Sequence, residues 1–365
     1  MYGPEETILS ALRGASLAYS RPTYGSLHAM QWGSGPFTDP KHSLRLYLSL
    51  AVAYMHGSSH INTEEALWTD EFMNDRYSPS GKEHLAAQHR VLDFIETHSR
   101  RGEFHSNIAV IQGRNDAWKS FGRGSLWSQE GEKWKFNKAC ESFDLLKVFY
   151  PDHIIDGCGP EGWFTSTPYG PVDLLPVEAP QDVMNRYKAM IFLGWNTYDK
   201  GDFERIRDYV FHGGTLILSA AHINACLQPD EKPCFPQDDA PVRELLGEDY
   251  RSLMQQTTLN YGKGKVIYFP EALYPAEDKL KAAYRKVMQD IAASTVHPEA
   301  ENGWIEAAPS SNTTDVLSIV KEADGWTVRV QTTGPDTVKF MFASNGLEKE
   351  VSFSSPGIHV YKLSL

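Results

Sequence analysis

The chain has 365 residues, of which 41% are hydrophobic, 22% charged and 12% aromatic. These proportions are those of ordinary globular proteins and exclude a disordered or collagen-like chain. Lys and Arg total 35 against 47 Asp and Glu, a formal net charge of −12 with no concentrated basic stretch. Such a chain repels phosphate backbones, so a nucleic-acid partner is excluded, and its length predicts two or three domains.

The cysteines, the longest apolar run and the first residues also restrict the class of protein. Cys140, Cys158, Cys226 and Cys234 form no CxxC pair and no spacing typical of zinc ligands, so we expect reduced thiols, no metal and no cofactor. Residues 44–55 are too few to cross a bilayer and predict a buried helix rather than a membrane protein. Residues 1–14 lack a secretory signal pattern, so a cytoplasmic protein is the default expectation.

The first third of the chain alternates helical and extended patterns. This order predicts parallel strands joined by helical crossovers, as in an α/β layer or barrel. The expected helices are residues 5–20, 40–56 and 82–100, and the expected strands are residues 25–32 and 58–62.

The middle section repeats the alternation with short, wholly apolar runs, which are typical of central strands covered by helices on both faces. We therefore predict an open, doubly wound, flavodoxin-like sheet. Gly213 and Gly214 are expected to end its central helix, and GKGK at residues 262–265 to form a hairpin turn. The expected strands are residues 107–113, 171–178, 188–194, 215–221 and 265–270, and the helices are residues 139–150, 200–211 and 277–293.

Beyond residue 298 the pattern changes to apolar and polar alternation, which predicts short antiparallel strands and a small β-sandwich. The expected strands are residues 316–320, 326–332, 338–344 and 357–363. The predicted domains are thus residues 1–104, 105–298 and 299–365, all within an α/β chain that ends in an all-β unit.

The strand predicted at residues 58–62 ends in a group of polar and aromatic residues. Glu64 and Glu65 follow this strand directly, with His60, Asn62 and Trp68 close by. Barrel enzymes carry their reacting groups at the carboxyl ends of parallel strands, so this position favours a functional site. An acidic loop exposed to solvent explains the same residues equally well.

Gln31 and Trp32 lie at the carboxyl end of the other strand in this first section. An indole ring can stack on the apolar face of a sugar, and an amide can bind its hydroxyls, so a carbohydrate ligand fits this pair. Trp32 and Trp68 are equally well explained as packing residues.

The middle section carries no catalytic or nucleotide-binding motif. Ser219 has no GxSxG framing, Cys226 comes too late to lie on a strand-to-helix elbow, and Gly113 is not followed by the glycines of a dinucleotide-binding loop. We therefore expect this section to have a structural role.

Three stretches carry a resemblance to a known family. They are AVAYMHGSSHIN (residues 51–62), YSPSGKEHLAAQHRVLDFI (residues 77–95) and FLGWNTYDKGDFERIRDYVFHGGTLILS (residues 192–219). Their order along the chain and their pattern of residues resemble the C-terminal half of glycoside hydrolase family 42-like β-galactosidases. The resemblance implies the end of a (β/α)8 barrel, then a trimerisation domain similar to class I glutamine amidotransferases without their nucleophile, then a small β domain.

The resemblance implies a fragment of a retaining glycosidase acting on β-linked sugars. The two strands of the first section would be barrel strands seven and eight, and the position matching the family's nucleophilic glutamate is occupied by Gln31, whose amide cannot attack an anomeric carbon. The acid/base glutamate would lie upstream of Met1. The chain alone is therefore expected to be inactive, within a homo-oligomer such as a trimer.

Two functions remain open on this basis. In the first, Glu64 or Glu65 is catalytic and the sugar is bound by Gln31, Trp32, His60, Asn62 and Trp68. In the second, the chain is a non-catalytic carbohydrate-binding or oligomerisation protein.

Overall fold

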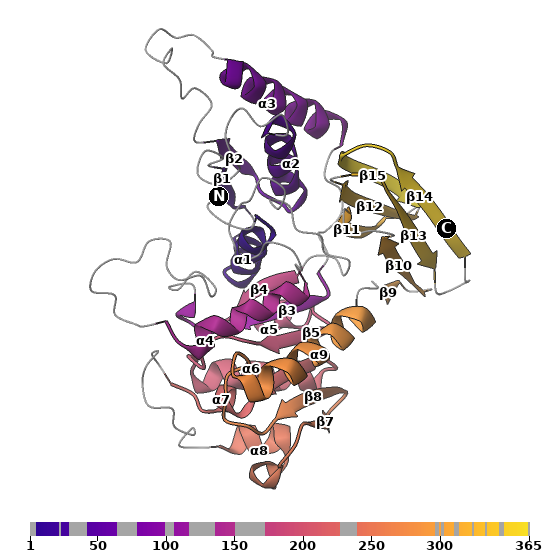
Figure 1. Ribbon diagram of the computed structural model, residues 1–365. Coiled ribbons are helices and arrows are strands. Elements are labelled where there is room, and N and C mark those ends of the chain that lie inside the picture. Colours follow the sequence, from indigo (N-terminus) through magenta and orange to yellow (C-terminus); the bar gives the residue numbers. More distant parts are fainter. Residues whose placement is uncertain are drawn as a thin grey trace, which may run out of the picture.

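The computed structural model describes residues 5–21, 23–28, 42–63, 79–98, 106–116, 136–149, 172–226, 239–295, 299–300, 303–309, 314–322, 325–332, 334–342 and 347–363. Three groups of elements are visible in Figure 1: a small helix-rich group, a six-stranded sheet with helices on its faces, and a set of antiparallel strands beside them. The chain is thus a mixed α/β protein with a parallel-rich sheet, as the sequence predicts.

The helix-rich group contains two short parallel strands and three helices. Strand β1 (Gly25–His28) pairs with β2 (His60–Thr63) in a register that sets His28 opposite Thr63. Helix α2 (His42–Met55) packs against α3 (Pro79–Thr97), and α1 (Glu5–Ala18) precedes both. This order is the predicted one and is compatible with part of a barrel. β1 is described as a strand only to His28, and residues 29–32 of the predicted strand lie outside the described residues.

The six-stranded sheet has the order β4-β3-β5-β6-β8-β7. Five strands are parallel, and their positions agree with the five apolar runs of the sequence. They are β3 (Ile108–Gln112), β4 (Val172–Pro176), β5 (Ala189–Phe192), β6 (Thr215–Ser219) and β8 (Gly264–Phe269). The sequence did not predict β7 (Thr257–Tyr261), which pairs antiparallel with β8 at the edge. It is half polar because only one of its faces is covered. The turn that joins it to β8 is formed by Gly262 and Lys263, the first two residues of the GKGK run for which a hairpin turn was predicted.

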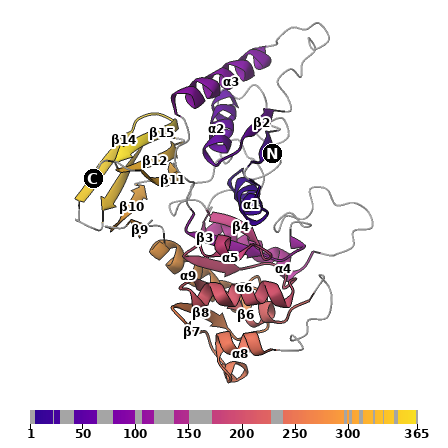
Figure 2. The same cartoon turned by 180° about the vertical axis from the view of Figure 1, so that it is seen from behind.

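Helices cover both faces of this sheet and create two cores. One face packs against α5 (Gln181–Met184), α6 (Lys200–Phe211) and α8 (Ala240–Leu246), which are best seen in Figure 2. The other face packs against the 3-10 helix η4 (Ser142–Val148) and α9 (Asp278–Thr295). Helix α6 ends as predicted, because Gly213 adopts a φ of 121° that favours glycine.

Two local predictions need correction. The single helix expected at residues 139–150 is a four-residue α4 (Lys138–Glu141) followed by η4. The strand expected to run to Ala221 ends at Ser219, which begins the short helix α7 (Ala220–Ile223). A short 3-10 helix, η5 (Tyr250–Ser252), also lies between α8 and β7. Apolar content alone cannot show these changes because strand, 3-10 and α-helical residues here are equally buried.

The last part of the chain forms two antiparallel sheets, β14-β13-β10-β9 and β11-β12-β15. Trp326, Val328 and Val330 of β12 share one apolar cluster with Val338 and Phe340 of β13, so the two sheets pack together. The sequence predicts four of these seven strands. The strands are β9 (Glu299–Ala300), β10 (Gly303–Pro309), β11 (Thr314–Glu322), β12 (Gly325–Thr332), β13 (Asp336–Phe342), β14 (Leu347–Phe353) and β15 (Gly357–Leu363).

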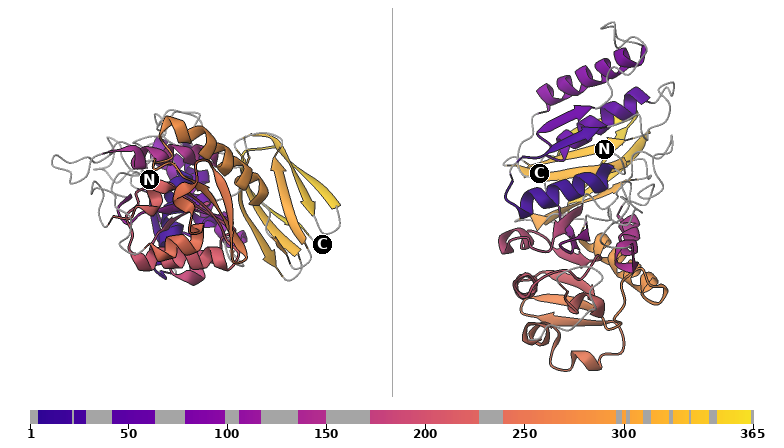
Figure 3. Two further views of the ribbon diagram at one scale, coloured as in Figure 1. Left: turned by 90° about the horizontal axis from the view of Figure 1, so that it is seen from below. Right: turned by 90° about the vertical axis from the view of Figure 1, so that its left-hand side faces the viewer.

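The three groups share cores at two places. Leu9 of α1 belongs to the cluster of α2 and α3, whereas Ala18 at the other end of α1 belongs to the core of the six-stranded sheet. Ile358 of β15 packs in the cluster of α2. Figure 3 shows the antiparallel strands lying beside the other two groups. The predicted domain boundaries at residues 104 and 298 stay predictions. No helix among the described residues is both long and apolar enough to span a bilayer.

Candidate functional site

The carboxyl ends of β1 and β2 lie at the same edge of their small sheet, because the strands are parallel and in register from Gly25–His60 to His28–Thr63. Leu27, His60 and Asn62 lie on the face of this sheet that is exposed to solvent, and Leu27 is 48% exposed. A side chain of β1 and two of β2 therefore line one open face. Open, polar strand ends of this kind are where α/β enzymes place binding groups.

The opposite face of the sheet packs on α2 through polar contacts. His28 is 1% exposed, and its ring contacts Ser49 of α2 through Nδ1, at 2.5 Å, and Ser26 through Nε2, at 3.0 Å. The Ser26 hydroxyl lies 3.2 Å from that of Ser58. These contacts fix β1, β2 and α2 relative to one another, because a buried polar group is stable only when its hydrogen bonds are made.

A cavity of about 560 Å³ lies between β2, α2 and α3. Its volume is in the range of sites that hold small molecules. Gln88 of α3 donates a hydrogen bond to the Thr63 hydroxyl at 2.9 Å across one end. None of the described residues that line the cavity is charged, so a neutral occupant with hydroxyl or amide groups fits this part of it. The lining residues are Leu50, Tyr54, Ser58, Ser59, Ile61, Asn62, Thr63, Gln88, Val91, Leu92 and Ile95.

Two of the seven site residues proposed from the sequence are in the described part of the chain. His60 and Asn62 lie on the same face of β2, two residues apart, and His60 Nδ1 is 3.1 Å from the hydroxyl of Ser59. Of the two, Asn62 lines the cavity, and His60 lies on the same face of β2 at the start of the strand. The other five lie outside the described residues: Gln31, Trp32, Glu64, Glu65 and Trp68.

The carboxyl edge of the six-stranded sheet is a second place to look for a site. Strand order reverses at β3, which lies between β4 and β5, and ligands of open α/β sheets bind at such a point. Here the space is occupied by Asp116, which is 3% exposed and accepts hydrogen bonds from the backbone N–H of Gly113 and of Trp195. A Cβ on Gly194 would lie 1.8 Å from this carboxylate, so only glycine leaves room for it.

Burial raises the pKa of Asp116 to about 8, although its two backbone N–H donors act in the opposite direction. The loops after β3 and β5 are also joined by a hydrogen bond from Arg114 N–H to the Thr197 carbonyl at 2.9 Å. Protein atoms thus fill the place where a ligand would bind, which agrees with a structural role for this section.

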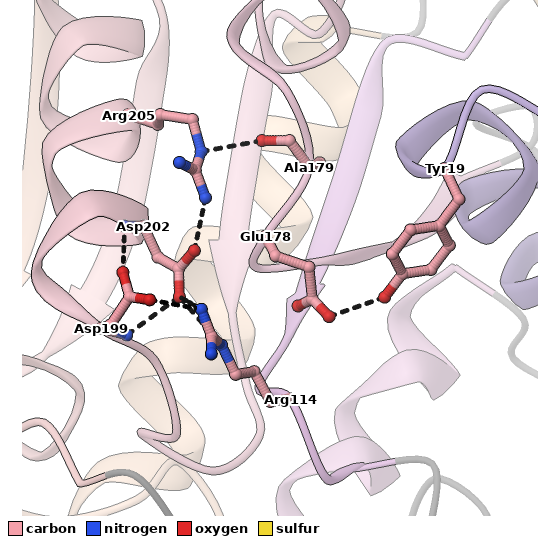
Figure 4. Close-up of polar contacts among 7 residues, drawn as sticks. All are labelled: Tyr19, Arg114, Glu178, Ala179, Asp199, Asp202 and Arg205. Atoms are coloured by element: carbon pink, nitrogen blue, oxygen red, sulfur yellow. Dashed lines mark hydrogen bonds and ion pairs between the residues drawn. The ribbon is translucent and has the colours of Figure 1, made fainter.

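A cluster of charged residues closes the neighbouring part of this edge (Figure 4). Arg114 lies 2.6 Å from Asp199 and 2.8 Å from Asp202, and Arg205 also contacts Asp202. Asp199 caps the N-terminus of α6, where the hydrogen bond from Asp202 N–H holds the pKa of Asp199 below its usual value. The positive charges of Arg114 and Arg205 therefore balance the negative charges of Asp199 and Asp202. The Asp199 side chain already caps the N-terminus of α6.

This cluster was not predicted from the sequence. The one available signal was the DKGD pattern at residues 199–202, an acidic form of a capping box directly before a helix. The pattern can show that α6 begins there, but it cannot show that Arg114 reaches the cap from the loop after β3.

Ser219 and His222 do not form an accessible nucleophile and base. Ser219 is fully buried, and its hydroxyl donates to the Leu273 carbonyl at 2.8 Å. His222 Nδ1 accepts from the Ser219 N–H at 3.1 Å, and burial lowers the His222 pKa to about 3. Cys226 is 7% exposed and contacts Asn196. None of the side chains of Ser219, His222 and Cys226 is accessible to a substrate. Among the described residues no group of three His, Cys, Asp or Glu side chains could hold a metal ion.

Comparison with known proteins shows what this fold is similar to. No family model matches the chain, and no curated protein matches its sequence. The structure is similar to Gan42B, a GH42 β-galactosidase from G. stearothermophilus, with a TM-score of 0.55 and 13% identity over 99% of this chain and 56% of that one. It is also similar to the β-galactosidase of the haloarchaeon Halorubrum lacusprofundi, with a TM-score of 0.51 and 14% identity over 100% of this chain and 56% of that one. The chain thus shares a fold with GH42 β-galactosidases and spans about half the length of each.

Proposed function

We propose that this chain is the C-terminal part of a retaining glycoside hydrolase that acts on β-linked sugars, and that its 365 residues alone are inactive. The observation that carries the proposal is the fold that it shares with two β-galactosidases along its entire length, which corresponds to 56% of each of those chains.

The small β1–β2 sheet also supports the need for further strands. Two strands by themselves are at best marginally stable, whereas a closed sheet has no open edges. The face bearing His60 and Asn62 is exposed, and Leu92 of α3 is 56% exposed beside the cavity along β2. The exposed apolar side chain of Leu92 beside β2 suits a sheet that continues past β2.

In the proposed site the substrate's sugar ring stacks on Trp32 and Trp68, and His60 and Asn62 bind its hydroxyls. A retaining hydrolase needs one carboxylate to attack the anomeric carbon and one carboxylic acid to protonate the leaving oxygen; water then releases the sugar. Glu64 or Glu65 would supply one of these groups or bind a hydroxyl. Gln31 would bind substrate, because its amide cannot act as the nucleophile.

The test is hydrolysis of a panel of aryl β-glycosides, including β-galactosides, by two proteins: this chain, and the product of its reading frame extended upstream of Met1. We expect turnover only with the extended protein. A stop codon directly upstream, or an extended protein that cleaves no member of the panel, would show that the proposal is wrong.

The carboxylate assignment has its own test in the extended protein. Replacing Glu64 or Glu65 singly by Gln is expected to lower kcat/KM by at least about tenfold for one of them, about 1.4 kcal/mol of transition-state stabilisation. Glu96→Gln, at an exposed position of α3, is the matched control and should keep full activity. If neither variant differs from this control, the assignment is wrong.

The second candidate, a non-catalytic carbohydrate-binding or oligomerisation protein, is favoured by one observation. The carboxyl edge of the six-stranded sheet is filled by Asp116 and by the Arg114 cluster, which leaves packing and assembly as its roles. A homo-oligomer measured by light scattering, together with sugar binding but no turnover in the extended protein, would favour this candidate.

A further inference from the structure

We propose that Arg13 joins the β1–β2 sheet and its helices to the edge of the six-stranded sheet, so that the two groups unfold and refold together as one cooperative unit. Arg13 lies on α1, the helix that packs along edge strand β4 and lies between the two groups in Figure 1. Its side chain is 6% exposed, and that of its partner Asp173 on β4 is 2% exposed.

On the side of the six-stranded sheet, Arg13 contacts both the side chain and the backbone of β4. Its Nε donates to the Asp173 carboxylate, and its NH2 group donates to the Val172 carbonyl at 2.7 Å. Tyr187 donates its hydroxyl proton to the second oxygen of Asp173 at 2.8 Å. The carboxylate therefore has partners on both oxygens, and α1 cannot leave β4 without exposing or stranding a buried charge.

On the other side, the same guanidinium reaches the end of α2. Its NH1 group lies 2.8 Å from Nδ1 of His56. A guanidinium can only donate hydrogen bonds, so Nδ1 accepts and the ring is neutral. Burial first, and the charge of Arg13 second, hold the pKa of His56 well below its usual value. The ring thus remains an acceptor for Arg13 throughout the neutral range.

From His56 the contacts continue to the starts of both short strands. The backbone carbonyl of His56 accepts a hydrogen bond from the hydroxyl of Tyr24, the residue before β1. The backbone carbonyl of Tyr24 accepts from the N–H of Ser59, the residue before β2, at 2.9 Å. One side chain, Arg13, is therefore linked through successive contacts to β4 and to the residues that directly precede β1 and β2.

The planar fork of arginine suits this position better than a lysine. It donates in three directions here, to Asp173, Val172 and His56, whereas one ammonium group at the end of a flexible chain cannot hold the same geometry. A neighbouring contact joins Tyr19, the residue after α1, to Glu178, two residues after β4, at 2.6 Å on the surface, and does not reach α2. Tyr19 therefore provides a control on the same interface.

The test uses the whole chain with three variants, Arg13→Met, Arg13→Lys and Tyr19→Phe, and measures hydrogen exchange by mass spectrometry. In Arg13→Met we expect amides of residues 25–28 and 60–63 to exchange at least about tenfold faster, whereas those of β5 and β6 keep their rates. Tyr19→Phe should leave both groups unchanged. Unfolding in urea should change from one transition to two in Arg13→Met.

If Arg13→Met does not fold, Arg13→Lys decides, because it keeps the positive charge and loses the fork. We expect it to show the same selective exchange at β1 and β2, with a smaller increase. The proposal is overturned if exchange in the folded variant rises equally in both groups, if it does not rise at all, or if Tyr19→Phe produces the same change.

Discussion

Asp116 shows what a single buried carboxyl group does at the edge of the six-stranded sheet. Each of its oxygens accepts one backbone N–H, from Gly113 and from Trp195. In Asp116→Asn one of these donors would face an amide NH2 group instead of an acceptor. We expect the free energy of unfolding to fall by about 1–3 kcal/mol, measured by urea denaturation at pH 4. Asp182→Asn, at an exposed position of α5, should have no such effect.

The pH dependence of Asp116 has a definite sign. Its pKa is about 8 in the folded protein, against an ordinary value of 3.8, so the folded state holds a proton that the unfolded state has lost between these two pH values. The stability contributed by this group is therefore present at acid pH and declines as pH rises from about 4 to 8, by up to about 1.4 kcal/mol per pH unit. The difference between wild type and Asp116→Asn, measured across this range, should show the decline. A difference independent of pH would contradict it.

His222 should give the opposite pH dependence. Its folded pKa is about 3, because burial disfavours the imidazolium, against an ordinary value of 6.5. The stability it contributes is complete above pH 6.5 and is lost as pH falls toward 3, by up to about 1.4 kcal/mol per pH unit. Thermal unfolding of wild type and His222→Gln between pH 4 and pH 8 tests this. We expect the two curves to converge on the acid side; parallel curves would show that His222 does not titrate on unfolding.

At the scale of an element, the contact between α1 and β4 depends on one glycine. A Cβ placed on Gly14 would lie 1.9 Å from the backbone oxygen of Leu174, an approach that no side chain movement can relieve. We expect Gly14→Ala to lower the melting temperature, even though Ala favours a helix over Gly by about 1 kcal/mol. Gly201→Ala is the control, because the nearest atom to its Cβ in α6 is 3.3 Å away, on the Asp199 side chain. It should have little effect; a Gly14→Ala protein as stable as this control would mean that α1 does not lie so close to β4.

At the scale of the whole molecule, the antiparallel sheets are attached partly through Ile358, which is 8% exposed within the cluster of α2. Ile358→Ala should cost about 2–5 kcal/mol and loosen the attachment. Limited proteolysis is then expected to release a C-terminal fragment sooner than in wild type. Val351→Ala removes apolar volume within the sandwich itself and should not favour that fragment. Equal release from both variants would show that Ile358 has no special part in the attachment.

Helices and strands were predictable where the sequence contains a continuous apolar run or a regular alternation of apolar and polar residues. The apolar runs predict β3, β5 and β8 because strands buried on both faces need apolar side chains at every position. The edge strand β7 was missed because its exposed face is polar, as Thr258 and Asn260 show. The division of the 139–150 helix into α4 and η4 has no sequence signal of comparable strength.

The site was predictable only in outline. The order of helices and strands predicts a parallel strand that carries His60 and Asn62, and in the structure His60 is the first residue of β2 and Asn62 lies near its carboxyl end. The roles of Glu64, Glu65, Gln31, Trp32 and Trp68 stay predictions. The cavity beside β2 was not predicted, because it depends on how far α3 lies from that strand.

The sequence by itself determined the alternation of helices and strands, the change to antiparallel strands after residue 298, and the polar residues at the ends of β2. These follow from local periodicity and turn chemistry, which are properties of neighbouring residues. Only the tertiary structure decided that Asp116 fills the edge of the large sheet and that Arg13 meets Asp173, which is 160 residues away. Contacts between such distant residues depend on how whole elements pack, and a single sequence carries no local pattern for them.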